Sequence, residues 1–121
     1  MKILVSNDDG YRAEGIERLR ELSGGKPTGF KLAIGHPWEW FAIAKAMQVT
    51  GITPDFIVVD GKEGGTGAAP AEFIDRMGAP MKDGLLLVHN TLVGLNLRSR
   101  IKLGCAGKVV SAFDIARMMA L

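Results

Sequence analysis

The sequence predicts an α/β domain in which four strand–helix units form a parallel sheet. Four short apolar segments that favour strands alternate with four longer segments that have helical periodicity. The third strand segment, FIVVD, is almost continuously apolar, which is typical of a strand buried on both faces of a parallel sheet. Glycine or proline separates most of these segments, at places where strands and helices end. Together these patterns favour parallel strands joined by right-handed helical crossovers.

The first unit is a short strand followed by an amphipathic helix. The strand, residues 2–5, ends at the polar run NDDG. The helix, residues 14–23, carries Ile16, Leu19 and Leu22 on one face. Glu14 and Arg18 lie four residues apart along it, and two consecutive glycines end it.

The other three units follow the same order. Pro37 suits the first turn of the second helix, and Gly51 ends that helix. Ser111 is a suitable N-cap for the last helix because Asp114 follows it three residues later. The expected strands are residues 29–35, 55–61 and 100–107, and the expected helices are residues 37–50, 83–98 and 111–121, with a possible helical turn at 71–77.

Length and charge restrict the class of protein. The 121 residues are 47% hydrophobic and predict a single globular domain, residues 1–121. Fifteen basic and thirteen acidic residues are interspersed, so the charge of +2 gives no reason to expect a nucleic-acid partner. Cys105 stands alone and permits no internal disulfide. The N-terminal segment fits neither a signal peptide nor a membrane span, so we expect a cytoplasmic location and no membrane partner.

The loops that follow the strands are the expected place for function, because ligands of parallel α/β sheets bind at the carboxyl ends of the strands. The first loop carries Asp8 and Asp9, and two carboxylates can hold Mg²⁺ or Mn²⁺. The alternative is that this polar run only ends the strand and caps the first helix. The loops at 60–69 and 104–107 are rich in glycine, which suits either turns or close approach to an anion.

The first unit, MKILVSNDDGYRAEGIERLRELS (residues 1–23), resembles the opening of the SurE family of survival nucleotidases. The resemblance implies a divalent-metal-dependent phosphatase site that begins with Asp8 and Asp9. In that family a serine and an asparagine on later loops complete the metal site, and this chain lacks those loops. The metal-dependent phosphomonoesterase is therefore an alternative rather than the first prediction.

The rest of the chain, residues 29–121, resembles the FMN-binding (βα)8 domain of the glutamate synthase family. The resemblance rests on GFKLAIGHPWEWFAIAKAMQVTGITPDFIVVDGKEGGTGAAPAEF and on GLLLVHNTLVGLNLRSRIKLGCAGKVVSAFDIARMMAL. It implies that a lysine faces the flavin and that glycine-rich loops approach the phosphate and substrate. The residues implied in cofactor binding are Lys31, Gly64, Gly65, Thr66, Gly67, Gly107 and Lys108.

The two resemblances together predict an engineered or recombined hybrid with its junction at residues 24–28. Because the eighth strand and the iron–sulfur cysteines of the glutamate synthase family would lie beyond Leu121, we expect no efficient catalysis. The remaining function would be weak binding of a small anion such as phosphate or FMN at the strand ends. A further alternative is a truncated FMN-binding glutamate synthase-like subunit whose missing strands come from a partner chain.

The resemblances also bear on architecture. The first unit resembles an open-sheet protein, so an open, flavodoxin-like or Rossmann-like three-layer sandwich is the favoured arrangement. The alternative is half of a (βα)8 barrel that pairs as a dimer, because an uncovered parallel edge favours association. Trp38, Trp40 and Phe41 are expected to pack against a neighbour. If Trp38 or Trp40 is exposed, it would mark such a homodimer contact.

Four other polar residues have structural and functional interpretations. His36 follows a strand and is expected in a turn rather than in catalysis, and His89 is expected to be a partly buried structural histidine. Asp60 and Glu63 bracket the glycine-rich loop. They are expected to brace that loop through its amides, with binding of a ribityl hydroxyl as the alternative.

Overall fold

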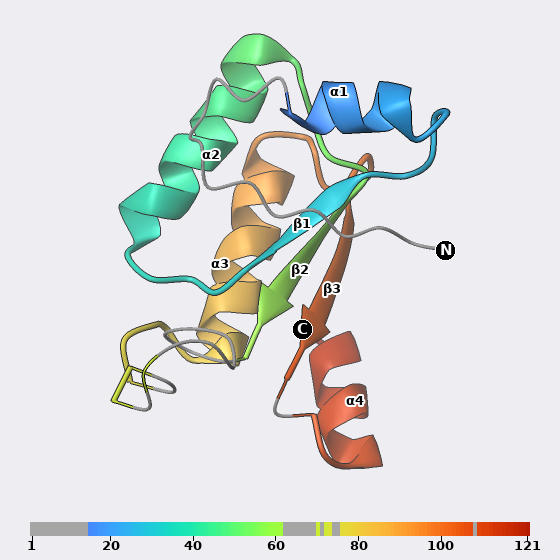
Figure 1. Cartoon of the computed structure of the whole chain (residues 1–121). Helices are drawn as coiled ribbons and strands as arrows, with labels where there is room; N and C mark the ends of the chain where they lie inside the picture. The colour runs from blue at the N-terminus through green and yellow to red at the C-terminus, as the bar shows by residue number, and fades with distance from the viewer. Residues whose placement is uncertain (1–14, 62–69, 71, 74–75, 108) are drawn as a thin grey trace.

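The fold is an open α/β domain with a parallel sheet (Figure 1). A computed structural model describes residues 15–61, 70, 72–73, 76–107 and 109–121. The expected first strand, residues 2–5, lies outside this part of the chain. The described elements are α1 (Gly15–Leu22), β1 (Gly29–Leu32), α2 (Pro37–Thr50), β2 (Phe56–Asp60), α3 (Met81–Gly94), β3 (Lys102–Ala106) and α4 (Ala112–Met119).

The three described strands lie in the order β1-β2-β3, and both pairings are parallel. In this register Lys31 is opposite Val58, and Val58 is opposite Gly104. The open parallel α/β sheet expected from the sequence is thus confirmed. All three strands are shorter than expected. β1 ends early because the segment after Leu32 leaves the sheet to reach the start of α2.

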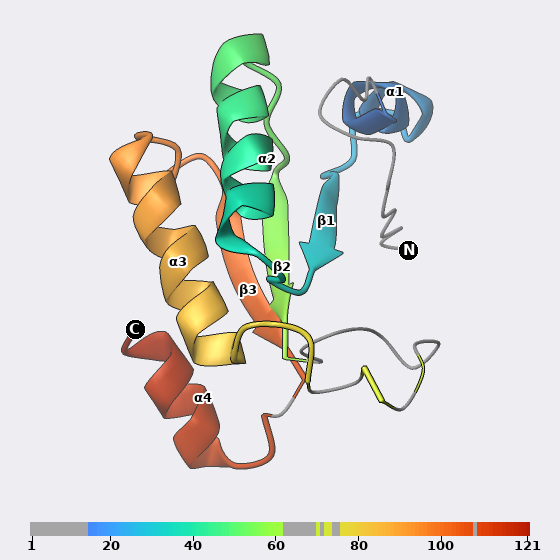
Figure 2. The same ribbon diagram turned by 90° about the vertical axis from the view of Figure 1, so that its left-hand side faces the viewer.

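Helices α2 and α3 cover the same face of the sheet (Figures 1 and 2). Each connects a strand to the next strand in the sheet, which is the connection that repeats in a (βα)8 barrel. Among the described elements, α1 lies near the amino ends of the strands, and α4 lies beyond the carboxyl end of β3 (Figure 1). A second helical layer on the other face stays a prediction.

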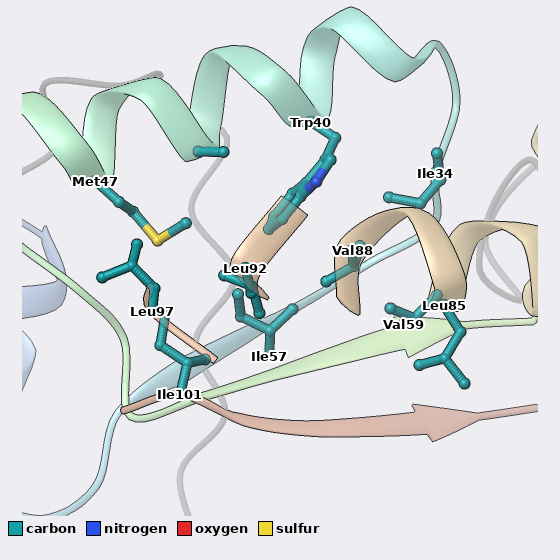
Figure 3. Packing of buried hydrophobic residues seen from close by; sticks show 11 residues of the cluster. Ile34, Trp40, Met47, Ile57, Val59, Leu85, Val88, Leu92, Leu97 and Ile101 are labelled. Carbon is teal, nitrogen blue, oxygen red and sulfur yellow. The ribbon is translucent and has the colours of Figure 1, made fainter. Parts of the chain in front are cut away.

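The core lies between β2 and the two covering helices. Ile57 and Val59 point from β2 toward side chains of α2 and α3 (Figure 3). Trp40 is the largest fully buried side chain, with 1% of its surface exposed. The core cluster comprises Ile34, Trp40, Ala44, Met47, Ile57, Val59, Leu85, Val88, Leu92, Leu97 and Ile101.

The helix ends follow local sequence signals with one exception. Pro37 begins α2, and Gly51, with φ of 73°, ends it in the left-handed conformation that favours glycine. The Ser111 hydroxyl accepts the N–H of Asp114 at 3.3 Å, which confirms the predicted cap of α4. Helix α3 begins at Met81 rather than Asp83, and it ends at Gly94, before the residues expected to continue it. Asn96, with φ of 57°, lies just beyond this end and cannot continue a right-handed helix.

The two short helices bury no residue in the described structure. In α1, Leu22 is 70% exposed, and Arg18 pairs with Glu21 at 3.1 Å. The expected partner Glu14 lies outside the described residues. In α4, Met118 packs against the core while Phe113 and Met119 are more than 80% exposed. The part of the chain that the structure describes therefore leaves apolar side chains of both helices uncovered.

None of the described helices is long and apolar enough to cross a membrane.

Candidate functional site

The candidate site begins on the sheet face that α2 and α3 leave uncovered. Side chains alternate between the two faces of a strand, and Ile57 and Val59 point toward the helices. Val58 and Asp60 therefore point to the other face. Lys31 is in register with Val58 and shares that face. The sheet thus brings a cation from β1 and an anion from β2 to one place near the carboxyl ends of the strands.

Lys31 and Asp60 form an ion pair on this face. The Lys31 Nζ lies 2.8 Å from Asp60 Oδ2. The Asp60 side chain is 8% exposed, whereas that of Lys31 is 33% exposed. A buried carboxylate requires a partner because desolvation of an isolated charge is costly, and Lys31 supplies that partner while part of its side chain stays in contact with solvent.

Gly61 and Gly107 close the same edge of the sheet. The N–H of Gly61 donates to the carbonyl oxygen of Ala106 at 2.6 Å, so the ends of β2 and β3 are held together. A Cβ on Gly107 would lie 3.2 Å from Asp60 Oδ1. Gly107 also has φ of 79°, which side-chain-bearing residues rarely adopt. Lys31 and Gly107 are therefore neighbours of the same carboxylate, although Lys31 lies on β1 and Gly107 directly follows β3.

The other predicted cofactor and metal residues lie outside the described residues. They are Asp8, Asp9, Gly64, Gly65, Thr66, Gly67 and Lys108. Glu63 also lies outside them. Within the described ranges, no group of three or more His, Cys, Asp and Glu residues is arranged to hold a metal ion. Asp8 and Asp9 are not part of that finding, so the metal site stays a prediction.

His36 occupies the turn predicted for it, directly before α2. Its N–H donates to the Glu39 carboxylate at 3.2 Å, and its ring stacks on Trp38 with centroids 4.1 Å apart. Trp38 is 63% exposed and Phe41 is 47% exposed, so of the three neighbouring aromatic residues only Trp40 packs in the core. An exposed tryptophan was expected to mark a contact between copies, and Trp38 is exposed; the contact itself stays a prediction.

His89 is half-buried on α3, as expected. Its Nδ1 accepts a hydrogen bond from Arg98 Nε at 3.2 Å. Arg98 Nη1 also donates to the carbonyl oxygen of Ile101 at 3.2 Å, just before β3. His89 thus connects α3 to the segment that leads into β3, and this is a structural contact at the amino end of that strand.

Sequence reasoning missed a second charged network, at the opposite edge of the sheet. Asp55 Oδ2 accepts the N–H of Thr28 at 2.7 Å and lies 2.9 Å from Arg20 Nη2. Partial burial alone would raise the pKa of Asp55, but the Thr28 N–H and the Arg20 guanidinium outweigh it and lower the pKa below its ordinary value. The spacing of Arg20 and Asp55 along the chain gave no signal, because only the folded sheet brings them together.

Comparison with known proteins identifies the family. A family model described as a conserved region in glutamate synthase matches residues 8–121. The chain belongs to the glutamate synthase family. The match begins before residue 29 and includes most of the segment compared above with SurE, so the SurE resemblance and the hybrid origin stay predictions.

Relatives within the glutamate synthase family come from bacteria, archaea and plants. The chain is 43% identical over 106 residues to the glutamate synthase large subunit-like protein YerD of Bacillus subtilis, which covers 88% of this chain and 20% of the relative. It is 33% identical over 110 residues to an archaeal glutamate synthase [NADPH] of Methanocaldococcus jannaschii, covering 90% of this chain and 21% of the relative. It is also 37% identical over 67 residues to a ferredoxin-dependent glutamate synthase of Arabidopsis thaliana, covering 55% and 4%. The chain thus spans about a fifth of the length of the first two.

Proposed function

We propose that this chain is an FMN-binding segment of a glutamate synthase-like protein and that it contributes the carboxyl ends of its strands to the flavin site. The observation that supports this proposal is the meeting of Lys31 and Gly107 at Asp60. These are the two described residues among those that the family resemblance implies in cofactor binding. They lie at the edge of the sheet where ligands of parallel α/β proteins bind.

The described residues fit an anionic cofactor. Lys31 offers an ammonium group that keeps part of its surface in solvent, on the face not covered by α2 and α3. Gly107 leaves open a place that a Cβ would fill, next to the Asp60 carboxylate. In this proposal Lys31 faces the flavin ring, and Gly107 with Lys108 approaches the phosphate near the start of α4. The flavin, when bound, supplies electron transfer, and the protein binds and orients it.

In this proposal, other βα units form the part of the flavin site that the described strands do not supply. Sheet edges β1 and β3 have no further strand among the described residues, and exposed apolar side chains lie on α4. Further units of a (βα)8 domain, or a second copy of this chain in a homodimer, would cover these surfaces. The Methanocaldococcus jannaschii and Arabidopsis thaliana relatives are named as glutamate synthases, and in this proposal glutamate synthesis comes to this chain only as part of such an assembly.

The direct test is a titration of the full chain with FMN, followed by flavin fluorescence, with molecular mass measured by light scattering on the same sample. We expect saturable quenching with a Kd below about 100 μM, which corresponds to about 5.5 kcal/mol of binding. Lys31→Met and Gly65→Val should weaken binding. The control is Lys45→Met, since Lys45 is exposed on α2 and its Nζ donates to Gln48. A folded chain that quenches no FMN would refute the proposal.

The metal-dependent phosphomonoesterase is the alternative that the SurE resemblance supports, and the same sample separates the two. Phosphatase activity that requires Mn²⁺ and disappears in Asp8→Asn would favour it. Flavin binding, in contrast, should be independent of divalent metal.

A further inference from the structure

Asp60 is the residue that connects every described part of the candidate site. It pairs with Lys31, it is the side chain nearest to the place where a Gly107 Cβ would lie, and the next residue, Gly61, bonds to Ala106. From the sequence, Asp60 is expected to brace the amides of the glycine-rich loop, and this stays a prediction because residues 62–69 of that loop lie outside the described residues. The structure pairs the Asp60 carboxylate with Lys31 on the neighbouring strand, and this pair gives Asp60 an effect on any ligand that Lys31 meets.

We propose that Asp60 is a positioning and specificity-determining residue, which orients the Lys31 ammonium group toward the strand-end ligand and lowers the affinity of the site for negative charge. This inference rests on the proposed function, because Lys31 is the residue that would face the anionic cofactor. It adds that the cation of the site is partly compensated within the protein before any ligand binds.

The orienting effect follows from the chemistry of the ammonium group. A lysine ammonium has three N–H donors on a flexible side chain. One donor is directed to Asp60 Oδ2 at 2.8 Å, and the Asp60 side chain is only 8% exposed. The remaining donors must therefore point away from Asp60, toward the exposed side of Lys31. A ligand then meets a fixed pair of donors rather than a mobile side chain.

The electrostatic effect follows from the charges. The Lys31 and Asp60 pair carries no net charge, so it attracts a phosphate or an anionic ring less strongly than an isolated lysine would. It still donates hydrogen bonds to neutral acceptors such as the carbonyl oxygens of a flavin ring. Removal of the Asp60 charge should therefore increase the affinity for anions, whereas loss of a purely structural brace should decrease it.

The two ends of β2 supply a matched control. Asp55 precedes β2 and pairs with Arg20 at 2.9 Å, while Asp60 ends β2 and pairs with Lys31 at 2.8 Å. Asp55→Asn and Asp60→Asn thus remove the same charge at the two opposite ends of β2. Only the Asp60 substitution should change the ligand site.

The experiment compares the full-length wild type, Asp60→Asn and Asp55→Asn in two measurements. The first is the rate at which a succinimidyl ester acylates Lys31, mapped by mass spectrometry with exposed Lys45 as the internal reference. The second is the affinity for FMN and for inorganic phosphate at low and high salt. Thermal unfolding of each variant establishes that it is folded, and Asp60→Glu, which keeps the charge, serves as the second variant if Asp60→Asn does not fold.

We expect Asp60→Asn to accelerate acylation of Lys31 several-fold and to tighten anion binding by on the order of tenfold, with a stronger salt dependence. Asp55→Asn should change neither, and Asp60→Glu should not tighten anion binding, because it keeps the negative charge beside Lys31. The inference would be overturned if Asp60→Asn left Lys31 acylation unchanged, bound anions more weakly than the wild type, or bound no anion at all. Tighter anion binding by Asp60→Glu would also overturn it. Phosphate binding that becomes tighter in Asp60→Asn, together with no FMN binding in any variant, would instead refute the proposed function and leave the charge effect of Asp60 supported.

Discussion

Two aspartates lie at the two ends of β2, and their surroundings give them different roles. Asp55 is held by a backbone N–H and a guanidinium at the amino end of β2. Asp60 is buried beside Lys31 at the carboxyl end. In parallel α/β folds, residues at the amino ends of the strands stabilise the domain, and residues at the carboxyl ends form the ligand site. Substitution of the aspartate should therefore reduce stability at Asp55 and change ligand binding at Asp60.

Asp55 predicts an acid-sensitive contribution to stability. Because its pKa is lowered in the folded state, the unfolded chain binds the proton more readily, and stability contributed by Asp55 is present above the ordinary pKa of 3.8. This contribution should be lost as pH falls below about 4 and through the folded-state pKa. Urea unfolding between pH 3 and pH 7 measures it. Asp55→Asn should flatten this part of the pH profile, and an unchanged profile in the variant would contradict the assignment.

The elements differ in how far local sequence determines them. Pro37, Gly51 and the pair Ser111 and Asp114 carry their own backbone or capping signals, so α2 and the start of α4 were predicted closely. The ends of the strands and of α3 were not, because they depend on where tertiary pairing stops. Trp40, Ala44 and Met47 have the spacing of one helix face, and this face is the buried side of α2.

Substitution of the two tryptophans of α2 by alanine should change the stability of the domain by very different amounts. Trp40→Ala should destabilise the domain by about 3–5 kcal/mol, because it removes a fully buried side chain from the core. Trp38→Ala should change stability by less than about 0.5 kcal/mol, because Trp38 is largely exposed. Urea unfolding of both variants under the same conditions makes the comparison. Similar losses of stability in the two variants would contradict the burial of Trp40 and the exposure of Trp38.

At the scale of the whole molecule, the alternation of strand and helix segments was enough to predict a parallel α/β domain, and the open form of the sheet was expected from the resemblance of the first unit to an open-sheet family. It was not enough to predict which side chains meet. Lys31 and Asp60 are on different strands, and their contact depends on the register that pairs Lys31 with Val58, which no local pattern reveals. The coverage of one face by both α2 and α3 likewise follows from strand order. The glutamate synthase resemblance identified Lys31 and Gly107 as candidates, and the fold brings both to Asp60.

The measurement that tests the central claim most directly is an amide NMR map of the full chain titrated with FMN. We predict that the largest shift changes fall at the carboxyl ends of the strands, at Lys31, Gly61 and Gly107. Amides at the amino ends, such as Thr28 and Lys102, should change little. Changes concentrated at the amino ends, or no changes in a folded sample at millimolar FMN, would contradict the assignment of this edge of the sheet as a flavin site.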